Sequence, residues 1–86
     1  MVIRWNEDKN KLLKKERGIG FETILSMIEE GKIVDILMHP TKQHQKYFFF
    51  LIKDYIYCVP FVEREDEIFL KTIFPSRKYT KQFKYK

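Results

Sequence analysis

The chain has 86 residues, of which 44% are hydrophobic and 16% aromatic, and its 17 lysines and arginines outnumber its 12 aspartates and glutamates. A chain of this length buries only about 60–65% of its unfolded surface, which leaves room for one hydrophobic core. The aromatic content is too high for a disordered protein. We therefore predict one domain over residues 1–86. The single Cys58 excludes an internal disulfide and a cysteine-based zinc site.

The N-terminal part predicts a short strand followed by two helices. Val2–Trp5 is typical of a strand, and Asn6 is a suitable N-cap for a helix over Glu7–Arg17, whose first turn is acidic. Gly18 can adopt the left-handed conformation that ends such a helix. A second helix, closed by Gly31, is predicted by apolar residues at the i, i+3, i+4, i+7 spacing: Phe21, Ile24, Leu25 and Ile28.

After Gly31 the pattern changes to β-branched and aromatic runs bounded by turn residues, which predict strands over 33–38, 47–53, 55–62 and 68–74. Lys53 and Asp54 form a tight turn between two of them. The connections are short, so we expect an α+β fold in which two N-terminal helices pack on a four- to five-stranded antiparallel sheet. Two short helices cannot cover all of the aromatic rings that these strands carry, and we expect a partner protein to cover the remaining ones. The rings concerned are Tyr47, Phe49, Tyr55, Tyr57 and Phe61.

No long apolar segment is present. The longest strongly apolar run, residues 47–52, is far below the ~20 residues of a membrane helix, and the N-terminus turns polar within a few residues. We therefore expect no secretion signal, no membrane partner and a cytoplasmic location, where a lone thiol stays reduced.

Positive charge is concentrated at the C-terminal end. Residues 71–86 carry six lysines and arginines and no acid, with aromatic residues interleaved. Such a run fits a polyanion, because cations pair with phosphates and rings stack on bases. The alternative is a solvated basic tail, over about 76–86, that only aids solubility.

Motifs for nucleotide or metal cofactors are missing. The three glycines are too far apart for a phosphate-binding loop, and His39 and His44 have no third ligand nearby, so we expect no cofactor and no metal. Cys58 lies in a predicted strand without an adjacent histidine, and we interpret it as a small core residue and not as a nucleophile.

The remaining chemistry-bearing residues are cations, a tyrosine and a carboxylate near predicted strand ends. Metal-free RNA cleavage needs only such groups, since a base takes the 2′-hydroxyl proton, a cation stabilises the phosphate and an acid protonates the leaving oxygen. Ordinary surface ion pairs use the same residue types, so composition permits this chemistry without demonstrating it. The residues are Glu63, Arg64, Lys71, Arg77, Lys78 and Tyr79.

Two stretches, and a residue pair between them, resemble the BrnT family of toxins from type II toxin–antitoxin modules. Residues 5–9 (WNEDK), continued by 17–22 (RGIGFE), are similar to the family's W-D-x-x-K and K-H-G-V-S-F-E. Residues 73–80 (IFPSRKYT) are similar to its I-I-S-A-R-K-A-T, and residues 63–64 to an E-R pair before the last strand. The matched residues are Trp5, Lys9, Gly18, Phe21, Glu22, Arg64, Arg77, Lys78 and Thr80, of which Trp5 and Phe21 are interpreted as core anchors. The chain departs from the family at three positions: Arg17 replaces a histidine, Gly20 replaces a serine, and Thr72 replaces an arginine. Lys71 is next to Thr72.

The resemblance implies a RelE-like fold and a ribonuclease that cleaves messenger RNA and arrests growth. It also implies neutralisation by a cognate antitoxin, with promoter DNA bound only by the toxin–antitoxin complex. Candidate catalytic residues are Arg77, Lys71 and Arg64 on the phosphate, with Glu63 or His39 as proton acceptor; candidate RNA-binding residues are Lys9, Lys78, Tyr79 and Lys81. Arg77 is expected at a strand end. The alternative function is a non-catalytic nucleic-acid-binding or partner-binding module on the same fold, such as a degenerate toxin.

Overall fold

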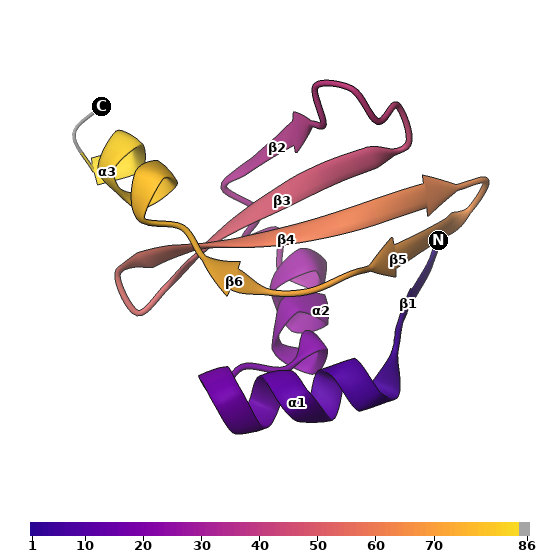
Figure 1. Cartoon of the computed structure of the whole chain (residues 1–86), viewed down its shortest axis with the longest axis horizontal. Coiled ribbons are helices and arrows are strands. Elements are labelled where there is room, and N and C mark those ends of the chain that lie inside the picture. Colours follow the sequence, from indigo (N-terminus) through magenta and orange to yellow (C-terminus); the bar gives the residue numbers. More distant parts are fainter. Residues whose placement is uncertain (85–86) are drawn as a thin grey trace.

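The structure, a computed structural model, describes residues 1–84 and has an α+β fold in which three helices pack on a mixed six-stranded sheet (Figure 1). The elements follow in the order β1 (Val2–Trp5), α1 (Glu7–Arg17), α2 (Phe21–Glu29), β2 (Asp35–Met38), β3 (Gln45–Ile52), β4 (Tyr55–Arg64), β5 (Glu67–Leu70), β6 (Phe74–Pro75) and α3 (Arg77–Lys84).

The two predicted N-terminal helices are confirmed, and their ends follow from local capping. The side chain of Asn6 accepts the backbone N–H of Lys9 at 2.9 Å, which satisfies one of the free donors at the start of α1. Gly18, with a φ of 70°, ends α1 and donates its N–H to the carbonyl of Lys14 at 3.0 Å. Gly31, with a φ of 72°, follows the end of α2.

The sheet has the strand order β1-β5-β4-β3-β2, and β6 pairs with β4 beyond the end of β5. Its centre is the β3–β4 hairpin. Lys53 and Asp54 connect these strands and have φ angles of 51° and 65°, which are the positive values of a two-residue turn that matches strand twist. The predicted tight turn is therefore confirmed without a glycine.

The prediction of an antiparallel sheet is wrong at one edge. β1 pairs with β5 in parallel, from Val2 opposite Glu67 to Trp5 opposite Leu70. Parallel strands need a long crossover connection, and here both N-terminal helices and the central hairpin lie between them. The predicted strand over 68–74 is also interrupted. β5 ends at Leu70, Ile73 is fully buried in the core, and pairing resumes in β6.

Both faces of the sheet are apolar, as predicted, and helices lie on both. α1 and α2 cover one face, where Phe21 and Leu13 join the larger core with Phe50. α3 lies on the other face and packs against a smaller cluster (Figure 1). The expectation that Tyr57 and Phe61 belong to an open aromatic surface is wrong. Both contribute to the larger core, and Phe61 is only 2% exposed.

The C-terminal basic segment forms a helix, which corrects the placement of Arg77 at a strand end: Arg77 is the first residue of α3. The Ser76 hydroxyl oxygen accepts the N–H of Tyr79 at 3.2 Å and so caps the helix. The Thr80 hydroxyl accepts the N–H of Ile56 at 2.8 Å and donates to the Ser76 carbonyl at 2.7 Å. These buried bonds join α3 to β4. Of the predicted basic tail, residues 85–86 lie outside the part of the chain that the structure describes.

Candidate nucleic-acid interface

The sheet face that carries α3, called here the α3 face, is only partly covered by that helix. Because side chains alternate along a strand, Ile56, Pro60, Val62 and Arg64 of β4 all point to this face. The helix packs near Ile56, which is buried, whereas Val62 is half-buried and Arg64 is exposed. The far end of β4 and its neighbour β5 therefore leave this face open.

An open hollow of about 310 Å³, called here the strand hollow, lies at that end and is lined by Val62, Arg64, Glu67 and Phe69. Arg64 stands directly opposite Glu67 in the β4–β5 ladder, and Arg4 from β1 forms an ion pair with Glu67. Lys71 follows β5, and its ammonium lies 5.9 Å from the centre of the Phe69 ring, which is 39% exposed. The strand hollow thus combines a carboxylate, cations and an accessible ring.

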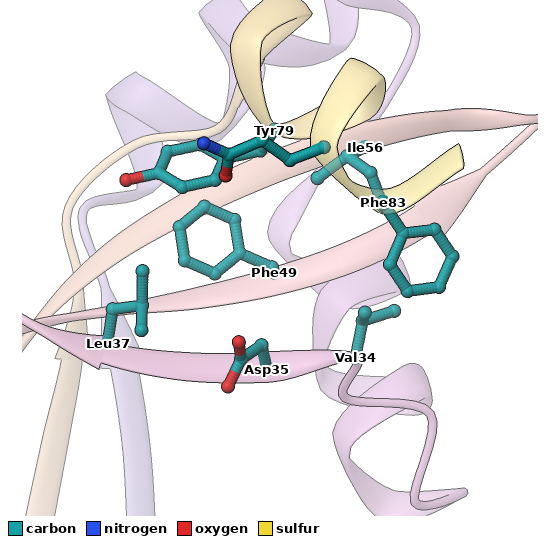
Figure 2. Close-up of a pocket in the computed structure, with 8 residues that line it drawn as sticks. Val34, Asp35, Leu37, Phe49, Ile56, Tyr79 and Phe83 are labelled. Atoms are coloured by element: carbon teal, nitrogen blue, oxygen red, sulfur yellow. The ribbon is translucent and has the colours of Figure 1, made fainter. Parts of the chain in front are cut away.

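A second depression, the α3 groove, lies between α3 and β2 and has a volume of about 280 Å³. Figure 2 shows Val34, Asp35 and Leu37 along one side and the α3 residues Tyr79 and Phe83 on the other. The rings of Phe49 and Tyr79 meet with centroids 4.5 Å apart. The residues that line the groove are mainly apolar. Asp35 is an acidic lining residue, and its carboxylate already accepts one hydrogen bond, from the N–H of Ile36 at 2.8 Å.

The two depressions are separate but lie on one continuous surface. Ile56 in the α3 groove and Arg64 in the strand hollow are eight residues apart on β4, which corresponds to about 26 Å. Tyr47 lies opposite Pro60, midway between them. The His39 ring lies against Tyr47 with centroids 5.9 Å apart. An aromatic surface therefore connects the strand hollow with the α3 groove.

The structure gathers only part of the predicted site residues on the α3 face. His39, Arg64 and Lys71 belong to it, and so do Tyr79 and Lys78, whose ammonium lies 5.7 Å from the Tyr79 ring. Two more predicted residues are exposed on α3: Arg77, which was predicted to be catalytic, and Lys81, which was predicted to bind RNA.

Two predicted residues lie away from this surface. Glu63 alternates with Arg64 and points to the opposite face, where its carboxylate contacts the Lys46 ammonium at 2.8 Å. Lys9 belongs to α1, which packs on that same opposite face. Neither side chain can act together with Arg64 in one site on the α3 face.

The N-terminal residues that resemble the toxin motif join α1 to α2. The Trp5 ring stacks on Phe21 with centroids 5.6 Å apart, which supports their interpretation as core anchors. Fully buried Asn10 accepts the Phe21 N–H at 2.7 Å and donates to the Glu22 carboxylate at 2.9 Å. The hydrogen bond from Asn10 and the hydrogen bond from the Lys14 ammonium both lower the pKa of the Glu22 carboxyl. Stability from this group is therefore lost as the pH falls through its lowered pKa.

Two residues of the strand hollow were not singled out from the sequence. Glu67 lies just before the predicted strand over 68–74, and Phe69 lies within that strand without a predicted functional role. A signal was available, because Glu67 and Phe69 alternate and so share one face of a strand that begins at residue 67. Lys71 directly follows that strand and continues the alternation. Starting the strand one residue later conceals this relationship.

Cys58 is a buried core residue, and it should be chemically inert in the folded protein. It is 3% exposed, and burial raises the pKa of its thiol to about 12, so almost no thiolate forms at neutral pH. We expect iodoacetamide at pH 8 to label the unfolded chain and not the native protein, as measured by mass spectrometry. Stability should also fall as the pH rises above about 9, because only the unfolded chain then releases the proton. Fast labelling of the native protein would contradict this burial.

Within residues 1–84, no helix is long and apolar enough to cross a membrane, and no three side chains of His, Cys, Asp or Glu are arranged to hold a metal ion. No family model matches the chain, and neither a curated protein nor a solved structure matches it significantly. The residues of the α3 face are therefore the basis on which function is inferred.

Proposed function

We propose that this protein is the toxin of a type II toxin–antitoxin module, with a RelE-like fold and a BrnT-like sequence, that cleaves messenger RNA without a metal ion. The observation that carries the proposal is the strand hollow. It places the Arg64 guanidinium and the Glu67 carboxylate beside the exposed Phe69 ring, with the Lys71 ammonium above that ring. These groups would supply charge stabilisation, proton transfer from the 2′-hydroxyl and base stacking, with water as the acid for the leaving oxygen.

In the proposed reaction, Arg64 and Lys71 bind the phosphate and stabilise the negative charge that builds on it. Glu67 accepts the proton of the adjacent 2′-hydroxyl, whose oxygen attacks the phosphorus. The bond from phosphorus to the 5′-oxygen breaks, and the leaving oxygen takes a proton from a water molecule. The hydroxide left behind takes the proton back from Glu67, which restores the carboxylate. The products are a 2′,3′-cyclic phosphate and a 5′-hydroxyl end. Both Glu63 and Glu67 form ion pairs, with Lys46 and Arg4 respectively, but only Glu67 lies on the same face as Arg64, so it takes the role first considered for Glu63.

The cations of α3 extend this surface. Arg77, Lys78 and Lys81 lie on a helix without an acid, and they would bind further phosphates of the same strand. The chain carries a net charge of +5, so its antitoxin should be acidic where it crosses α3 and apolar in the α3 groove. Such a partner would cover the RNA site directly. The complex, and not the toxin alone, would bind promoter DNA in the cytoplasm.

The proposal is tested by incubating the purified protein with single-stranded RNA in EDTA. We expect cleavage that leaves 2′,3′-cyclic phosphate ends, which mass spectrometry of the fragments identifies. Binding should weaken with salt, and each phosphate contact should add about 0.7 to the slope of log affinity against log salt. Intact RNA with salt-dependent binding would favour the non-catalytic binding module. RNA that is neither cleaved nor bound would contradict the toxin function and the nucleic-acid-binding module, and would favour a partner-binding module.

A further inference from the structure

His39 follows β2 and begins the loop over residues 39–44. Its Nδ1 atom accepts the backbone N–H groups of Thr41 and Lys42, each at 3.1 Å, and the Thr41 hydroxyl lies 3.4 Å from the same atom. A ring nitrogen that accepts hydrogen bonds carries no proton. The proton of the neutral ring is therefore on Nε2, and the backbone of this loop selects that tautomer.

The other ring nitrogen is available for a ligand. Within the part of the chain that the structure describes, Nε2 has no hydrogen-bond partner, although the ring is half-buried. The ring is tilted by 38° against Tyr47, which packs beside Phe49 on the α3 face. Tyr47 lies between the strand hollow and the α3 groove, so a strand of RNA that runs from one to the other passes this pair.

We infer that His39 is an RNA-binding residue whose Nε2–H donates a hydrogen bond to a phosphate oxygen, while the neighbouring Tyr47 ring supports the adjacent base. This inference rests on the proposed function. A phosphate oxygen is an acceptor without a proton, which matches a ring nitrogen that only donates. The same geometry removes His39 from the proton-acceptor role considered for it, because its one basic nitrogen is already engaged by two backbone N–H groups.

Two substitutions separate this role from a merely structural one. In His39→Asn the side-chain oxygen can replace Nδ1 as acceptor for the loop N–H groups, but nothing replaces the Nε2 donor. In His39→Gln the longer amide can place a donor near the position of Nε2. The probe is a 2′-O-methylated RNA hexanucleotide, which binds without being cleaved. We expect His39→Asn to retain the wild-type melting temperature and to bind about tenfold more weakly or worse, with partial recovery in His39→Gln.

Nitrogen-15 NMR of the histidine rings gives a second readout that does not depend on activity. The free protein should show an unprotonated Nδ1 and a protonated Nε2 for His39, and the Nε2 proton should shift when the hexanucleotide binds. A protonated Nδ1 in the neutral ring overturns the inference. Equal RNA binding and cleavage by the wild type and His39→Asn also overturns the inference, whereas the proposed function then stands. A wild-type protein that neither binds nor cleaves RNA contradicts the proposed function, and the inference fails with it.

Discussion

Replacing Glu67 with glutamine is expected to slow RNA cleavage by about 100- to 10,000-fold, the range typical for loss of a general base. The change preserves the shape of the side chain and removes its charge, so RNA binding should stay the same or become tighter. The melting temperature should barely change, because the Arg4–Glu67 pair is exposed and such pairs contribute about 1 kcal/mol or less.

Glu65→Gln is the matched control for this variant. Glu65 is exposed in the turn that precedes β5, does not line the strand hollow, and differs from Glu67 by only two positions. Removing its charge should leave the cleavage rate within about twofold of the wild type, since it is outside the reaction site. If both variants cleave RNA as fast as the wild type, Glu67 is not the proton acceptor. If Glu67→Gln loses affinity and cleavage together, the carboxylate acts by maintaining the shape of the hollow.

Replacing Phe21 with alanine is expected to lower the free energy of unfolding by about 3–5 kcal/mol. The ring is completely buried between α2 and the sheet, and it stacks on Trp5. A domain of 86 residues has a total stability of only about 4–13 kcal/mol at about 0.05–0.15 kcal/mol per residue, so the expected loss is a large fraction of it. Urea denaturation followed by circular dichroism measures the change.

Phe69→Ala makes the same replacement at an exposed ring and should have the opposite consequences. Phe69 lines the strand hollow and is 39% exposed, so its loss should affect stability much less than the loss of Phe21. RNA affinity should fall, because base stacking on an aromatic ring contributes about 1–3 kcal/mol per base. Equal destabilisation by the two substitutions would identify Phe69 as a core residue without a stacking role.

The candidate interface follows less directly from the sequence than the fold does. Arg64 and Lys71 were identified as candidate cations, and both lie at the strand hollow. The carboxylate was assigned to Glu63 when the one facing Arg64 across the ladder is Glu67. Neighbouring residues on a strand point to opposite faces, so Glu63 and Arg64 cannot share one site. The predicted strands over 55–62 and 68–74 leave Glu63, Arg64 and Glu67 outside, so alternation assigned no face to any of the three. The engagement of His39 Nδ1 depends on the path of a loop, which no residue pattern specified.

The sequence by itself determined the elements whose signals are local. Asn6 and Gly18 fixed both ends of α1, the spacing of Phe21 and Ile24 indicated the buried side of α2, and the alternating rings predicted the central hairpin. Capping bonds and side-chain periodicity act over one to four residues, so they are visible in any short window of sequence.

Only the tertiary structure decided the parallel pairing of β1 with β5 and the formation of α3. The first joins residues about 65 positions apart, and β1 itself does not indicate which strand it will pair with. The second is an eight-residue helix, which is too short to be stable alone in water. It forms because Tyr79 packs on Phe49 and the Thr80 hydroxyl binds the backbone of β4. Both features depend on surfaces that exist only after the sheet has assembled. The capping residue Ser76 is a local signal for α3, but a cap alone does not stabilise a helix of this length.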